Sequence, residues 1–145
     1  MTNLGRLLGL DIGGKRIGVA ISDEMGLIAS PSAMVLRGDA SGREIREHAS
    51  RLGAVRLIVG MPVGLSGHEG AQAKDVRDFV DSIAAEIGLP VEYWDERLTT
   101  SIAEKSLIAS GSRREKRKQQ VDAVAAAVIL QGYLDSRRWA AKYPR

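Results

Sequence analysis

The chain has 145 residues, 44% of them hydrophobic and 27% charged, which suits a single globular domain spanning residues 1–145. It contains no cysteine, which excludes disulfides and thiolate zinc sites, and its two histidines argue against a histidine-based metal site. The formal net charge is +3, and any metal must be held by oxygen ligands, which Mg²⁺ and Mn²⁺ prefer.

The first third of the chain predicts a β-meander followed by a helix. Residues 7–11 form an apolar run that ends in a carboxylate, and residues 13–15 predict a tight turn because glycines tolerate positive φ. Residues 16–22 follow as the second strand of this hairpin. A third, irregular strand is expected over residues 27–36, and apolar residues near helical spacing predict a helix over residues 42–53.

The middle of the chain predicts two more strands joined by a helical crossover. Residues 55–60 are short and rich in β-branched side chains, as in a central parallel strand. A glycine-rich loop over residues 62–70 leads to an amphipathic helix over residues 71–87. Residues 91–94 form the last predicted strand, which again runs into carboxylates.

The last third predicts helices. Thr99 or Thr100 can cap a helix over residues 101–109, a polar basic segment covers residues 111–119, and a final helix is expected over residues 121–138. The order of elements predicts an α/β fold with a five-stranded mixed sheet, an antiparallel meander followed by parallel strands, flanked by helices.

Three acidic residues are predicted to converge at one edge of this sheet. Asp11 ends the first strand, Glu96 follows the last strand, and Asp122 is expected in the first turn of the final helix. Binding sites in open α/β sheets lie outside the carboxyl ends of the strands. Asp95 is an alternative to Glu96, because strand geometry alone favours neither.

Such an acidic cluster suits metal-dependent hydrolysis of phosphodiester bonds. Divalent cations bridged by carboxylates can activate a water and stabilise the leaving oxygen. Without metal, three close carboxylates repel one another. The alternative is local: Asp11 can begin a turn, and Asp122 can favour the positive end of the helix dipole.

An ordered set of motifs resembles the YqgF-type family of pre-16S ribosomal RNA nucleases and Holliday junction resolvases. The set covers nearly the whole chain, and its order is more specific than any single motif. Its members are residues 10–20 (LDIGGKRIGVA), 60–62 (GMP), 70–73 (GAQA), 95–100 (DERLTT), 121–126 (VDAVAA) and 129–134 (ILQGYL).

The resemblance implies an RNase H-like fold and a catalytic, metal-binding role for Asp11, Glu96 and Asp122. It further implies action on ribosomal RNA precursor, at the 5′ end of pre-16S RNA, or on four-way DNA. Members of the family carry Asn and Asp in the loop after the Gly-x-Pro element, where this chain has Gly64 and Ser66. Substrate contacts from that loop are therefore not carried over.

Basic residues near the acids are candidates for contacts with substrate phosphates. Lys15 and Arg16 follow Asp11 across the turn, and Arg97 is next to Glu96. A solvated hairpin tip and a structural salt bridge are their respective alternatives. A basic run before Asp122 is predicted to contact the phosphate backbone through Arg113, Arg114, Arg117 and Lys118.

The distribution of charge favours a polyanionic partner. Residues 113–145 carry nine Lys/Arg and three Asp/Glu, whereas residues 1–112 carry twelve and fifteen. A solvated helix end is the alternative. No signal peptide is visible, and the longest apolar run, Ala123–Leu130, is too short for a bilayer, so we expect a cytoplasmic protein without membrane contact.

The predicted function is therefore a metal-dependent nuclease with Mg²⁺ or Mn²⁺, acting on structured RNA in preference to four-way DNA, as a monomer or weak homodimer. One alternative is an actin-like ATP-binding protein, since Asp11-Ile12-Gly13-Gly14-Lys15 resembles a phosphate-loop hairpin. Against it, those proteins clamp a nucleotide between two domains. A catalytically silent RNA-binding assembly factor is a further alternative.

Overall fold

The computed structural model describes residues 5–62, 70–95 and 114–142, and in the last range it describes side chains from residue 121 onward. The predicted loop at residues 62–70 and helix at residues 101–109 therefore lie largely or wholly outside the described residues. Within them, no helix is long and apolar enough to cross a membrane.

A five-stranded mixed sheet forms the centre of the molecule, as predicted. Its order is β3-β2-β1-β4-β5, in which β1 is antiparallel to β2 and parallel to β4. The β2–β3 pair is antiparallel and the β4–β5 pair parallel. The strands are β1 Arg6–Ile12, β2 Arg16–Ser22, β3 Ala29–Leu36, β4 Ala54–Met61 and β5 Val91–Asp95.

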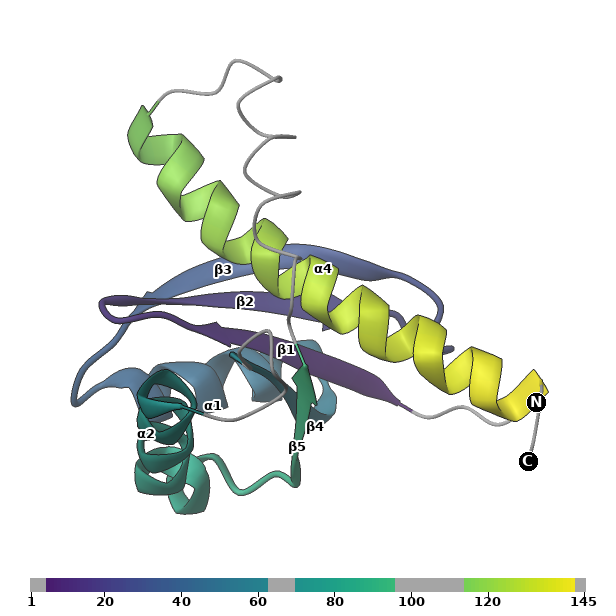
Figure 1. The fold of residues 1–145 in the computed structure, drawn as a ribbon, viewed down its shortest axis with the longest axis horizontal. Coiled ribbons are helices and arrows are strands. Elements are labelled where there is room, and N and C mark those ends of the chain that lie inside the picture. The colour runs from purple at the N-terminus through teal and green to yellow at the C-terminus, as the bar shows by residue number, and fades with distance from the viewer. Residues whose placement is uncertain (1–4, 63–69, 96–113, 143–145) are drawn as a thin grey trace.

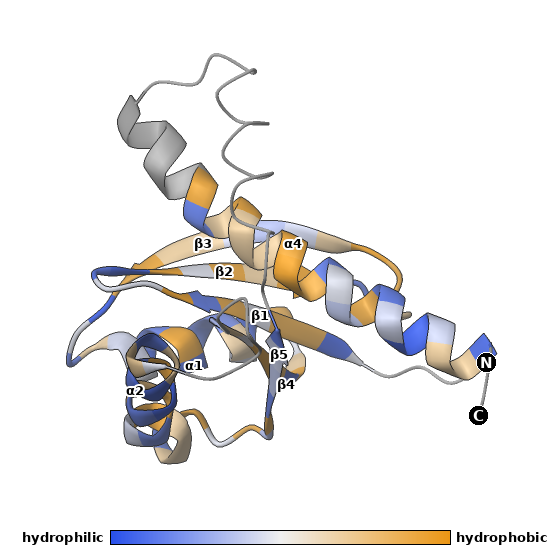
Figure 2. Cartoon of the chain, in the orientation of Figure 1, coloured by the Kyte–Doolittle hydropathy of each residue, from blue (hydrophilic) through white to orange (hydrophobic). Residues whose placement is uncertain are grey.

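Helices cover both faces of the sheet. Helices α1 (Ser41–Leu52) and α2 (Ala71–Ile87) lie together on one face, and the long helix α4 (Arg114–Lys142) crosses the other (Figure 1). Helix α4 packs chiefly on β1, β2 and β3. It is apolar over the sheet and polar toward its C-terminal end (Figure 2).

The alternation of side chains along β1 divides the core in two. Leu8, Leu10 and Ile12 join the larger cluster, which α1 and α2 cover. Leu7 belongs to the smaller cluster under α4. Because successive side chains of a strand point to opposite faces, Asp11 shares the α4 face with Leu7.

Helix α4 is longer than predicted at both ends. It begins at Arg114 and ends at Lys142, whereas the sequence pattern predicted residues 121–138. The basic segment before residue 121 is therefore helical in large part. Lys, Arg, Glu and Gln are good helix formers, so this run extends the helix although it lacks an apolar face.

The β2–β3 turn shortens the third strand relative to the prediction. The backbone N–H groups of Leu27 and Ile28 donate to Asp23 Oδ1 at 2.7 and 3.0 Å, and the ladder begins only at Ala29. These two hydrogen bonds stabilise the charged carboxylate, so they lower the pKa of Asp23 below its ordinary value.

The hairpin turn between β1 and β2 forms where predicted, but not for the predicted reason. Positive φ angles occur at other glycines, namely Gly5, Gly26, Gly53 and Gly88. Gly13 instead allows a close approach, because a Cβ there would lie 2.7 Å from the carbonyl oxygen of Arg16. The N–H of Gly13 donates to that same oxygen at 2.8 Å.

Candidate active site

Asp11 lies near the carboxyl end of the central strand and on the face that α4 covers. It is half-buried, and its direct partner across the β1–β2 ladder is Gly18. Directly opposed residues of an antiparallel pair point to the same face. Whatever packs on Gly18 therefore lies beside the Asp11 side chain.

The backbone of Asp122 packs on Gly18. A Cβ added at Gly18 would overlap the carbonyl oxygen of Asp122, so only glycine permits this approach of helix to strand. The approach places the helical turn that carries Asp122 above the residue paired with Asp11. The structure thus brings together two of the three acids that the sequence singled out.

The predicted position of Asp122 in the first turn of its helix is wrong. Helix α4 starts at Arg114, so Asp122 lies in the third turn, beyond the reach of the helix's N-terminal charge. The helix dipole therefore does not account for a carboxylate at this position.

Asp122 forms an ion pair with Arg16. The Nε of Arg16 donates to Asp122 Oδ2 at 2.7 Å, and the two side chains are 37% and 19% exposed. Arg16 precedes Gly18 by two residues on β2, so both face α4. Arg16, which the sequence suggested as a phosphate contact, lies within the acidic site and holds one oxygen of a predicted metal ligand.

Strand β5 separates the two acids that the sequence left as alternatives. Asp95 pairs with Met61, which belongs to the core under α1 and α2. Trp94, one residue earlier, packs against the core under α4 and meets Tyr133 edge-on, with ring centroids 5.9 Å apart. Asp95 therefore lies on the face opposite to Asp11, and Glu96 is outside the described residues.

The predicted phosphate contacts are only partly described. Lys15 is exposed at the hairpin tip, next to Arg16. Arg97 and Arg113, like Gly64 and Ser66, are outside the described residues. Arg114, Arg117 and Lys118 belong to the first turns of α4, so the backbone that leads to Asp122 is helical there.

The role of Gly18 was not predicted from the sequence. A glycine inside a strand often marks a close backbone approach, and that signal was present. Gly9 is a second example on the same face, because a Cβ there would lie 2.9 Å from Leu130 Cβ. Both glycines allow α4 to approach the sheet closely.

The acids present could supply oxygen ligands to a hard divalent cation. Asp11 and Asp122 contribute carboxylates from two elements, and Asp122 Oδ2 is shared with Arg16. Among the described residues, no group of three or more His, Cys, Asp or Glu is arranged to hold a metal.

Comparison with known proteins confirms the resemblance inferred from the motifs. The family model RuvX, described as Holliday junction resolvase, matches residues 5–136. A protein of Symbiobacterium thermophilum named "Putative pre-16S rRNA nuclease" is 46% identical over 134 residues, 91% of this chain and 93% of that protein. A protein of the same name from Desulforamulus reducens is 45% identical, covering 90% of this chain and 97% of that protein.

A solved structure supports the fold. The chain resembles T. thermophilus RuvC in complex with a Holliday junction substrate, with a TM-score of 0.54, 16% identity, and coverage of 92% of this chain and 95% of that one. The predicted RNase H-like fold is thereby confirmed. The family match favours a nuclease over the actin-like ATP-binding alternative.

Proposed function

The chain belongs to the RuvX family and is a nuclease, and we propose that residues 1–145 form one domain that cleaves nucleic acid with Asp11, Asp122 and Glu96. The observation that carries the proposal is the contact between the backbone of Asp122 and Gly18. Gly18 is the residue directly across the ladder from Asp11. This contact brings two half-buried carboxylates to the same face of the sheet. A shared cation gives them a function there.

The donor set fits Mg²⁺ or Mn²⁺. Both described acids offer carboxylate oxygens, which these hard cations prefer, and the chain has no cysteine to attract softer metals. When bound, the metal would lower the pKa of a coordinated water and stabilise charge on the leaving oxygen. The protein contributes the fixed separation of two ligands that belong to different elements.

We assign the third ligand to Glu96 and not to Asp95. The pairing of Asp95 with Met61 directs it toward the core under α1 and α2, away from Asp11. The motif at residues 95–100 then leaves Glu96 as its acidic ligand.

Arg16 acts through Asp122 in this proposal. Its Nε donates to Oδ2 at 2.7 Å, which would fix the orientation of a carboxylate that could hold the metal. Hydrogen bonds of this kind orient ligating carboxylates and tune metal affinity. Arg16 is therefore a positioning residue, while Lys15, Arg97, Arg113, Arg114, Arg117 and Lys118 remain our candidates for phosphate contacts.

The proposed substrate is the 5′ end of pre-16S ribosomal RNA. The names of the two bacterial relatives support it, whereas the description of the family model supports a four-way DNA junction. We favour RNA because both of these relatives, which are 45% and 46% identical over nine-tenths of the chain, carry that name. We further propose that the protein is cytoplasmic and acts as a monomer or a weak homodimer.

Asp11→Asn tests the mechanism. The variant keeps the size and hydrogen-bonding capacity of the side chain and removes the charge that holds the metal. Single-turnover cleavage should fall by about two orders of magnitude or more, whereas substrate affinity should hold or rise. Near wild-type cleavage, at matched metal and salt, would contradict the proposal, and a loss of folding would make Asp11 structural.

A parallel assay tests the substrate. Wild type is given a pre-16S transcript and a four-way DNA junction, each with Mg²⁺ and with Mn²⁺, and cleavage rates are compared. Faster cleavage of the transcript, abolished in Asp11→Asn, is expected. Preference for the junction would reverse the assignment, and binding without any cleavage would favour a silent RNA-binding factor.

A further inference from the structure

We propose that the last two turns of α4 form a second binding surface of the nuclease, which takes up a single-stranded segment of the nucleic-acid substrate. The surface consists of Arg137, Arg138, Trp139 and Lys142, and we call it the distal surface. It rests on the proposed function, since its ligand is the strand whose other part lies at Asp122.

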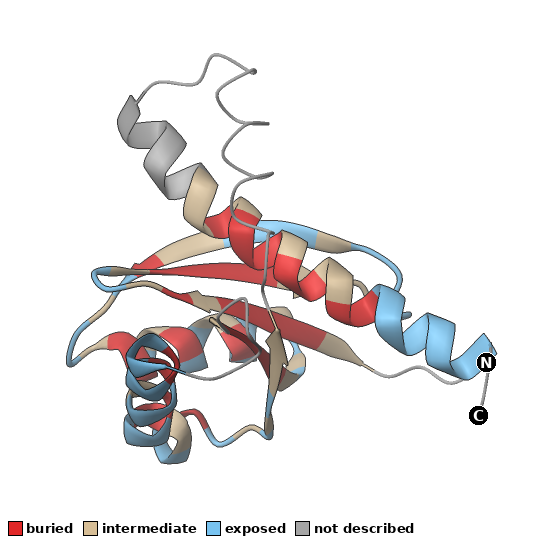
Figure 3. Cartoon of the chain, viewed as in Figure 1, coloured by how far each residue is buried: buried red, intermediate tan, exposed pale blue. Residues whose placement is uncertain are grey.

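Helix α4 extends beyond the core that it covers. Leu134 is 1% exposed, and every residue from Asp135 to Lys142 is exposed (Figure 3). At 1.5 Å per residue, this overhang is about 12 Å long. Burial of apolar surface does not explain these turns, whose side chains are exposed to solvent.

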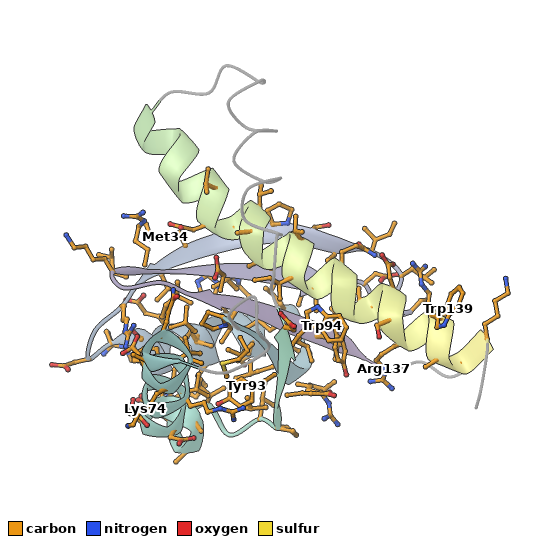
Figure 4. All side chains as sticks on the ribbon, viewed as in Figure 1. Met34, Lys74, Tyr93, Trp94, Arg137 and Trp139 are labelled. Carbon is orange, nitrogen blue, oxygen red and sulfur yellow. The ribbon has the colours of Figure 1, made fainter. Side chains whose placement is uncertain are left out.

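The overhang presents three cations and one exposed aromatic ring. Arg137, Arg138 and Lys142 oppose a single acid, Asp135, to which Arg138 donates. Trp139 is 66% exposed and lies at the end of the helix, whereas Arg137, two residues earlier, points from another side of the helix (Figure 4). Cations beside an exposed indole match the two recognition elements of a nucleic-acid strand, its phosphates and its base faces.

Arg137 is held in place before any ligand arrives. Its Nη1 donates to the hydroxyl of Tyr133 at 3.1 Å, and its guanidinium carbon lies 5.7 Å from the centre of that ring. The Tyr133 hydroxyl in turn donates to Glu92 on β5. Because the sheet fixes this side chain, binding through Arg137 costs less conformational entropy than binding through a freely rotating arginine.

An unpaired strand suits Trp139 better than a duplex or a second copy of the chain. Bases inside a duplex are stacked on their neighbours, so an indole on a helix surface can meet a base face only where the strand is single. A two-fold interface through this surface would bring the three cations of one copy against those of the other, which is repulsive.

The distal surface and the catalytic acids share one rigid element. Sixteen positions separate Asp122 from Arg138 along α4, which corresponds to about 24 Å. At 3.4 Å per stacked nucleotide, a strand needs roughly seven nucleotides to span that distance. Only substrates with a single-stranded flank of this length or more can reach both places.

The test measures affinity in full-length Asp11→Asn, so that binding is seen without cleavage. The probes are a duplex with blunt ends and the same duplex with a single-stranded extension of about twelve nucleotides, longer than the required span. Each is made as RNA and as DNA, which identifies the preferred strand. The added substitutions are Trp139→Ala and, separately, Arg138→Gln with Lys142→Gln.

Trp139→Ala should weaken binding of the extended probe about fivefold or more, and leave the blunt probe unchanged. The logarithm of the binding constant falls linearly with the logarithm of the salt concentration. For the extended probe, the double substitution should make this slope shallower by about 0.7 for each phosphate that the variant no longer neutralises. Leu36→Ala, another exposed apolar side chain, and Arg43→Gln with Arg46→Gln, exposed on α1, are the matched controls. They should change neither quantity.

Equal affinity of the variants and the parent protein for the extended probe would overturn the distal surface. Equal losses on both probes would also overturn it, because the surface would then not distinguish a single strand from a duplex. A shift from dimer to monomer in Trp139→Ala would assign the surface to a second copy. If Asp11→Asn binds no probe at all, the proposed function fails together with the surface.

Discussion

The two faces of the sheet are built on different principles. The face under α1 and α2 is filled by large aliphatic side chains, such as Leu10, Ile45 and Val80, which interdigitate. The face under α4 carries Gly9, Gly18 and Ala20 on the strands, opposite a helix rich in alanine. One face maximises burial, and the other minimises the distance between helix and strand.

The difference shows how a site can be built into a small core. Large side chains tolerate small shifts of a helix, because dispersion contacts are many and individually weak. Glycine contacts between backbones leave no such freedom, so they set the position of Asp122 relative to Asp11. The α1/α2 face therefore supplies stability, and the α4 face supplies geometry.

Substitution of Gly18 should have the largest effect. Gly18→Ala forces α4 away from β2, since the new Cβ would overlap the Asp122 carbonyl. A displacement of about 1 Å can cost about a hundredfold in rate, so cleavage should fall at least that far, and stability by about 1–3 kcal/mol. Gly38→Ala is the control, because nothing lies within 4 Å of its Cβ. Normal cleavage by Gly18→Ala would contradict the idea that the glycine contact sets the position of Asp122 relative to Asp11.

The opposite outcome is expected on the other face. Ile45→Ala leaves a cavity between α1 and the sheet, which should lower the free energy of unfolding by about 2–5 kcal/mol. Ile45 is fully buried and belongs to the core under α1 and α2. Cleavage per folded molecule, measured well below the unfolding transition, should stay within about twofold of wild type. A larger loss would mean that both faces set the site.

Arg16→Gln tests the ion pair between Arg16 and Asp122 on the α4 face. Removing the partner of Asp122 Oδ2 should weaken Mn²⁺ binding about 10–100-fold, measured by calorimetry without substrate. Lys15→Gln removes the same charge from the neighbouring, exposed residue and should leave Mn²⁺ affinity nearly unchanged. If Arg16 is instead a phosphate contact, Mn²⁺ affinity will hold and the salt slope of substrate binding will fall by about 0.7–0.9.

The smallest expected effect is a dependence of stability on pH at the surface of the α1/α2 side. Arg37 donates from Nη1 to Asp75 Oδ2 at 2.9 Å and from Nη2 to Asp75 Oδ1 at 2.8 Å. These hydrogen bonds hold the pKa of the Asp75 carboxyl below its ordinary value of 3.8. The pair therefore stabilises the folded state above pH 3.8, and this contribution is lost as pH falls through the lower folded pKa.

Asp75→Asn measures this contribution. Its melting temperature should lie slightly below that of wild type near neutral pH, and the difference should shrink as pH falls below 3.8. Cleavage should be unaffected, because the pair lies on the α2 side of the sheet. A difference that grows toward low pH would have the wrong sign for a lowered pKa.

The sequence by itself determined the elements and the chemistry. Apolar runs bounded by turn residues located all five strands and placed Asp11 near the end of the first one. Helical spacing located α1 and α2, and the ordered motifs identified the family. These features are local, since they depend on the spacing of apolar residues and on the turns between them. The third strand begins two residues later than predicted, and α4 begins seven residues earlier and ends four residues later. The start of α4 was missed because its polar, basic run carries no apolar periodicity.

The tertiary structure alone decided which acids meet. Gly18 and Asp122 lie far apart in the chain, and their contact depends on where a long helix crosses the sheet. The pair between Arg16 and Asp122, and the separation of Asp95 from Asp11, follow from the same crossing and from strand register. Contacts of this kind arise from the packing of whole elements, which the spacing of residues along one segment does not record.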